Sequence, residues 1–148
     1  MITLDTTTQL LQFTLSASVT TNQLVFSATY QDYTSTSFTP IENDGVSNNT
    51  TAVTIVSSPA SSTQRLIKNI VIQNADTASA TVTIIYNNNS TLRNIIVATL
   101  AVGDQLIYED GHGLSTVDTN GCLKTSSATS GSGTFGIPDL RGNVGLRV

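Results

Sequence analysis

The sequence predicts an all-β protein, either an antiparallel β-sandwich or a jelly roll of about eight strands, with an extended C-terminal arm. The 148 residues include 25 Thr, 17 Ser and 12 Asn against 16 charged residues. Thr suits a pleated surface, whereas Ser and Asn compete for the backbone groups of a helix. Short runs alternate apolar and polar residues, and no segment carries a 3.6-residue apolar stripe capped at both ends. An apolar fraction of 39% and a net charge of −4 favour a folded chain over a disordered one.

Four segments show the alternation of a strand that has one face on a core and the other in water. In chain order they cover residues 11–15, 24–30, 53–55 and 82–86. Two further segments, residues 65–73 and 95–100, are apolar on both faces. Such segments are either central strands or strands whose outer face contacts a partner chain, and the sequence leaves both interpretations open.

Clusters of Asn, Asp, Gly and Ser separate these runs and predict the connections. Residues 42–51 read as a polar loop around Asp44 and Gly45, and residues 74–80 as a short hairpin connection between two of the strongest strands. Residues 87–90 and 118–121 have the composition of tight turns. The predicted sandwich domain therefore occupies residues 1–125.

The composition changes after this domain, so residues 126–148 are predicted to form a Ser/Gly-rich linker and a C-terminal arm. The arm is too small to fold alone. We expect it to become ordered on a partner, while the alternative is an added edge strand of its own sandwich. The side chains expected to dock on the partner are Phe135, Ile137, Pro138, Leu140 and Arg141.

The charge pattern argues against a nucleic-acid partner, because the six basic residues are scattered along the chain. Arg65 and Lys68 are the only close pair, and we expect them to form a solvated rim. No apolar run reaches the roughly 18–20 residues of a membrane span, which predicts no membrane association. The first residues lack the pattern of a secretory signal, and a single cysteine fits assembly in a reducing cytoplasm.

The densest polar cluster is residues 108–113, where His112 lies between two glycines and follows two carboxylates. A metal or acid–base site is conceivable there, but metal sites usually need three or four ligands. The better interpretation is a tight turn in which the glycines supply positive φ and Asp110 bonds the backbone. Cys122 is expected to begin a strand as a small buried residue. The sequence thus predicts no catalytic residue, no metal ligand and no cofactor, and hence no enzyme.

Two stretches resemble structural proteins of tailed bacteriophages. Residues 100–124 read Leu-x-x-Gly-x-x-Leu-x-Tyr, then Asp-Gly-x-Gly, then Asp-x-x-Gly-x-x-Lys, which is similar to a strand-turn-strand module of small virion proteins. An aromatic residue often follows the second turn glycine in that module, where this chain has Leu114. Residues 4–7 and 19–24 are similar to the start of the same proteins. Residues 135–142, Phe-Gly-Ile-Pro-Asp-Leu-Arg-Gly, resemble the signature of phage tail-collar domains.

The resemblance implies a capsid decoration, or cement, protein that is assembled in the host cytoplasm and located in the virion. Its expected partners are other copies of itself, as a homotrimer, and the major capsid protein or other virion proteins. One alternative is a component of the tail fibre, collar or head–tail adaptor, which the collar-like fragment favours. A third class is a carbohydrate-binding module or glycan-active enzyme, because sandwiches serve both and fold alone does not separate them.

Overall fold

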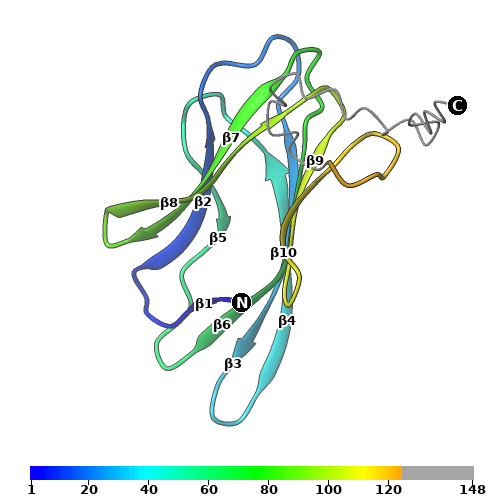
Figure 1. The fold of residues 1–148 in the computed structure, drawn as a ribbon. Coiled ribbons are helices and arrows are strands. Elements are labelled where there is room, and N and C mark those ends of the chain that lie inside the picture. Colours follow the sequence, from blue (N-terminus) through cyan, green and yellow to red (C-terminus); the bar gives the residue numbers. More distant parts are fainter. Residues whose placement is uncertain (125–148) are drawn as a thin grey trace, which may run out of the picture.

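The structure, a computed structural model, describes residues 1–124, which form two antiparallel β-sheets packed face to face (Figure 1). The described residues contain ten strands and no helix, so the predicted all-β sandwich is confirmed with two strands more than expected. The strands are β1 (Ile2–Leu4), β2 (Gln9–Leu15), β3 (Val25–Tyr33), β4 (Phe38–Val46), β5 (Val53–Val56), β6 (Gln64–Gln73), β7 (Ala80–Asn88), β8 (Thr91–Leu100), β9 (Gln105–Glu109) and β10 (Gly113–Val117).

The first sheet, on the right in Figure 1, has the strand order β10-β9-β6-β3-β4. Strand β6 lies at its centre, as its two apolar faces allowed. One edge of β6 pairs with β3 over nearly its whole length. The other edge pairs first with β1, through residues 65–67, and then with β9, through residues 69–73. Strands β1 and β9 therefore follow one another along the same side of β6.

The second sheet, on the left in Figure 1, has the order β5-β2-β7-β8. Strands β7 and β8 form a hairpin whose turn places Asn89 and Ser90 at φ values of 49° and 67°. Two consecutive residues of positive φ match the right-handed twist of the flanking strands. The turn predicted from residues 87–90 is confirmed.

Alternate residues of both sheets meet in one core, as the period-2 runs predicted. Leu11, Phe13 and Leu15 of β2 are buried against Phe26 of β3, and the rings of Phe13 and Phe26 meet edge to face with centroids 5.4 Å apart. The inner side of β6 contributes three buried isoleucines, Ile67, Ile70 and Ile72.

The polar loop predicted over residues 42–51 is confined to residues 47–51, because β4 runs through to Val46. Strand β4 is an edge strand with a mostly exposed surface, so polar residues are tolerated along it. Of its inward positions, Ile41 packs against the core, Asn43 is hydrogen-bonded and Gly45 is small. The Asn43 side chain donates to the Ile55 carbonyl at 2.7 Å, and Gly45 lies under the Phe26 ring, where a Cβ atom would come within 2.9 Å of the ring.

The connection 74–80 was also predicted wrongly, since it crosses from the first sheet to the second instead of closing a hairpin. Buried hydrogen bonds hold this crossing. The Asn74 amide donates to the carbonyls of Leu100 and Ala101, and the Asp76 carboxylate accepts from the backbone amides of Thr20, Thr21, Asn22 and Thr77 at 2.7–3.1 Å. These two side chains tie the crossing to the β2–β3 and β8–β9 loops at one end of the sandwich.

The Asp76 contacts predict a stability change in acid. The amide of Thr20, helped by those of Asn22, Thr21 and Thr77 and opposed by burial, lowers the pKa of Asp76 from 3.8 to about 2. A carboxylate with a depressed folded-state pKa contributes stability above its unfolded-state value and loses it as the pH falls through the folded value. Urea unfolding should therefore show that Asp76→Asn has a lower free energy of unfolding than the unmodified chain near neutral pH. This difference should become smaller as the pH falls from about 4 to about 2.

A matched control is Asp44→Asn, which removes an exposed carboxylate on β4. Its stability relative to the unmodified chain should stay nearly constant across the same pH range. If the loss of unfolding free energy in Asp76→Asn does not change with pH, the charge of Asp76 is not what stabilises the crossing.

Candidate functional site

The polar cluster at residues 108–113 is the turn of the β9–β10 hairpin, as predicted. Gly111 and Gly113 have φ values of 90° and 87°, a conformation that favours glycine. Asp110 does not bond the backbone as expected, because its carboxylate accepts a hydrogen bond from Lys68 Nζ at 2.9 Å. This hydrogen bond raises the pKa of Lys68 and lowers that of Asp110. His112 is exposed, with Nδ1 3.5 Å from a carboxylate oxygen of Glu109.

Cys122 was expected to be buried, and it is exposed. The reason is local: its backbone amide and that of Asn120 both donate to the Asp118 carboxylate, which closes a turn over residues 118–121. The chain then makes only a single bridge, between Leu123 and Val117, where a full strand was expected. Within residues 1–124 no three His, Cys, Asp or Glu side chains group closely enough to hold a metal ion.

Arg65 was expected in a solvated rim, and it is 7% exposed. Its guanidinium makes two hydrogen bonds of 2.7 Å to the Asp32 carboxylate and donates to the Ser57 carbonyl at 2.8 Å. It also lies over the Tyr30 ring, 4.6 Å from the centroid. The hydrogen bond to Asp32 raises the pKa of Arg65 against the effect of burial. The residue is a structural cation that joins β6, β3 and the chain after β5.

Strand β8 is the surface of the described residues that is least protected against pairing with another chain. It is an edge strand of ten residues, six of them apolar, with Arg93 as its one charge. The other edges are weaker templates, since β5 has four residues, β10 has five, and β4 carries Pro40, Glu42 and Asp44. Proline, charge and shortness are the usual means by which natural sheets block edge-to-edge association.

Apolar side chains are also exposed along β8. Val97 is 59% exposed, and Leu92 and Ile95 are exposed as well. A bulge makes Ile95 an extra residue, because Asn94 and Ile96 pair with neighbouring residues of β7. Of the two interpretations of segment 95–100 left open by the sequence, the central strand is excluded among the described residues. Within residues 1–124 the outer edge of β8 pairs with no other strand.

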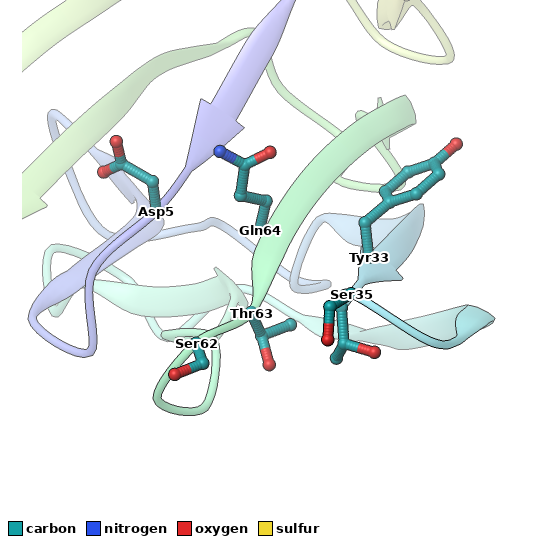
Figure 2. Close-up of a pocket in the computed structure, with 7 residues that line it drawn as sticks. Asp5, Tyr33, Ser35, Ser62, Thr63 and Gln64 are labelled. Carbon is teal, nitrogen blue, oxygen red and sulfur yellow. The ribbon is translucent and has the colours of Figure 1, made fainter.

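A pocket of about 520 Å³ opens at the end of the sandwich where β3 turns into β4 and β6 begins. Figure 2 shows Asp5 on one side of it, Tyr33 on the other, and Gln64 between them. Ser35, Ser62 and Thr63 complete the view. The lining comes from three loops that are far apart in the sequence, which is why no sequence pattern indicated it.

The five docking residues predicted in the C-terminal arm, Phe135, Ile137, Pro138, Leu140 and Arg141, lie outside the described residues. The described chain ends at Lys124, whose ammonium bonds the buried carboxylate of Asp104 beside the β8–β9 turn. The β8–β9 turn lies at the upper end of the sandwich in Figure 1, whereas the β3–β4 turn, beside the pocket, lies at the lower end.

No known protein family, no curated protein and no solved structure matches this chain. Residues 1–124 include no helix long and apolar enough to cross a membrane.

The ion pair between Arg65 and Asp32 predicts a large stability effect. Asp32→Ala leaves the Arg65 charge buried without its carboxylate, and such breaks cost about 3 kcal/mol or more of unfolding free energy. Chemical denaturation of the full chain measures this loss. Asp110→Ala, which removes the partner of the more exposed Lys68, is the matched control and should cost much less. Equal losses in the two variants would contradict the structural role given to Arg65.

Proposed function

We propose that the chain is a non-enzymatic structural protein of a bacteriophage virion, a decoration or cement protein that stabilises the shell through contacts with coat subunits. The observation that carries this proposal is the long, apolar and unblocked edge strand β8. A strand of this kind can form main-chain hydrogen bonds with a strand of another polypeptide. In a monomeric protein it would promote aggregation. The resemblance of residues 100–124 to small phage virion proteins supplies the cellular context.

Three carboxylates that are buried or half-buried support a structural role. Asp32 holds Arg65, Asp76 holds four backbone amides, and Asp104 accepts from Lys124 and from the backbone amide of Ala101. Each of these acids closes a loop or joins two elements. These three carboxylates thus fix loops and strands in place. Such a role suits a protein that must keep its shape within an assembly.

We place a second copy of this chain against β8 and retain the homotrimer as the expected state. Main-chain pairing along the edge would bury Leu92, Ile95 and Val97 at little electrostatic cost, since Arg93 is the strand's one charge. In a trimer, β8 of one copy contacts a different surface of the next. Two β8 strands paired around a twofold axis would give a dimer, so the solution mass distinguishes the two arrangements.

The alternative function is a component of the tail fibre, collar or head–tail adaptor. The feature that favours it is the collar-like sequence of residues 135–142. Both functions place the protein in the virion, assembled in the host cytoplasm with other virion proteins, and they differ in the number of copies per particle.

Copy number is the test of this function. Quantitative mass spectrometry of purified particles should find on the order of hundreds of copies, because a decoration protein follows the repeated coat lattice. About three to eighteen copies would indicate a tail or neck position in place of the shell. Absence of the chain from purified particles would overturn the virion assignment altogether.

The contact assigned to β8 predicts that a charge on the strand prevents oligomer formation. Val97→Lys places an ammonium where the partner strand would pack, and light scattering should show a shift from trimer to monomer. Val46→Lys is the matched control, because Val46 is a 51% exposed valine on the blocked edge strand β4. A monomeric unmodified chain, or an oligomer that survives Val97→Lys, would contradict the contact.

The proposed arm predicts that deletion of residues 127–148 spares the fold and weakens attachment. All ten strands and the core lie within residues 1–124, so the melting temperature should change little. A tethered arm adds affinity without enlarging the domain. The shortened chain should therefore be displaced from particles by the full chain in a competition experiment. Unfolding of the shortened chain would show that the arm belongs to the core.

A further inference from the structure

The pocket at the Tyr33 end of the sandwich has the composition of a site for a polyhydroxylated ligand. Its lining is polar apart from one aromatic ring, with hydroxyl groups from Ser35, Ser62 and Thr63. Pockets for drug-like or lipid ligands are mostly apolar with a few polar groups, which is the reverse of this arrangement. A ligand that fits must offer many hydrogen-bonding groups and one apolar surface.

Tyr33 supplies an exposed aromatic surface in a fixed position. The side chain is 39% exposed, its hydroxyl donates to Gln31 at 3.0 Å, and its ring packs edge to face against Phe38 with centroids 5.2 Å apart. A second hollow of about 250 Å³, lined by Met1, Thr3 and Leu66, shares Tyr33 and Gln64 with the first. These two side chains therefore stand between a polar hollow and a more apolar one.

The loops around the pocket are held in shape by their own hydrogen bonds. The backbone amide of Asp5 donates to the Gln9 side chain at 2.7 Å, and the Thr34 hydroxyl accepts from the Ser37 amide at 3.0 Å. Within residues 1–124, the Asp5 carboxylate and the Gln64 amide make no side-chain hydrogen bond. A carboxylate accepts hydrogen bonds from hydroxyl groups, while an amide both donates and accepts. The site thus combines fixed loops with polar groups available to a ligand.

We propose that this pocket binds a neutral sugar residue of a glycan. A pyranose ring has an apolar face of C–H groups that packs on an aromatic ring, and its edge of hydroxyl groups matches Asp5 and Gln64. Anionic ligands fit less well, because Asp5 is the charged residue of the lining and the nearby Arg65 is already paired with Asp32. Phosphate groups and sialic acids are therefore disfavoured, and neutral hexoses and N-acetylhexosamines are the class that fits.

The position of the pocket is compatible with binding while the protein is attached to a particle. The pocket is lined by Gln64 at the start of β6, whereas Lys124 bonds Asp104 beside the β8–β9 turn. The ten residues of β6 span about 33 Å at about 3.3 Å per residue. If the protein is held on a shell by the end of the sandwich that carries the β8–β9 turn, the sugar site lies at the end away from the shell. The sugar site itself does not depend on that arrangement.

The experiment is a glycan array probed with the full chain, carrying neutral hexose and N-acetylhexosamine oligosaccharides beside their sialylated forms. We expect neutral glycans to be bound, and titration of one of them against Tyr33→Ala to show binding weakened about tenfold or more through loss of the aromatic face. Tyr33→Phe keeps the ring and should bind nearly as well as the unmodified chain. Val46→Ala, far from the pocket on β4, is the control for unspecific effects.

Gln64→Ala provides a second variant that does not disturb the aromatic pair, and it too should weaken binding. Circular dichroism confirms that each variant is folded. Failure of the unmodified chain to bind any neutral glycan would overturn the proposal, as would binding confined to sialylated glycans. Neutral-glycan binding that survives both Tyr33→Ala and Gln64→Ala would place the sugar elsewhere and overturn it as well. None of these outcomes alters the copy number expected for a decoration protein. The sugar site and the decoration function can therefore be contradicted independently of each other.

Discussion

The pairing of β6 with three other strands is the constraint on which the rest of the structure depends. One edge of β6 is taken by β3, and the other is divided between β1 and β9. Its inner face supplies three buried isoleucines to the core, while Arg65 near its start ties it to Asp32 and to the chain after β5. Register is fixed because a slip of one residue would turn Ile67, Ile70 and Ile72 to the outer face. The first strand, β1, and the ninth, β9, are thereby both aligned on β6.

The two sheets of an open sandwich have unpaired edge strands. The edge strands of this chain differ in how well they are protected against pairing, and the proposed contact is based on that difference. The edge strands β1, β5 and β10 are short, and the edge strand β4 carries proline and charge. The edge strand β8, in contrast, has ten residues and exposes Leu92, Ile95 and Val97. The Ile95 bulge bends the strand but leaves its apolar residues outside. These side chains are the apolar surface on which the proposed contact with another chain rests.

Much of the fold could be predicted from the sequence, because alternating apolar and polar residues show which face of a strand is buried. The inward residues of β2, β3 and β7 follow the period of two. For the run at β6, apolar on both faces, a central strand was one of the two interpretations left open, and the structure has it. Strand β4 was missed because an edge strand needs little apolar surface, and its Asp44-Gly45 pair reads as a turn. The change of sheet at residues 74–80 was missed for another reason. A hairpin and a crossing need the same turn residues, and only the long-range bonds of Asn74 and Asp76 separate them.

The candidate sites were less accessible to sequence analysis, since each depends on residues that only the fold brings together. The burial of Arg65 follows from Asp32, which is 33 positions away in the chain. The pocket joins Asp5, Tyr33 and Gln64 from three loops, none of which carries a motif of its own. The fold thereby separates two kinds of surface. The buried acids Asp76 and Asp104 fix the loops at the end where Lys124 lies, while the polar groups at the opposite end are left to face solvent. The proposed sugar site therefore depends on Asp5 and Gln64, whose side chains make no hydrogen bond within residues 1–124, among loops that other hydrogen bonds hold in shape.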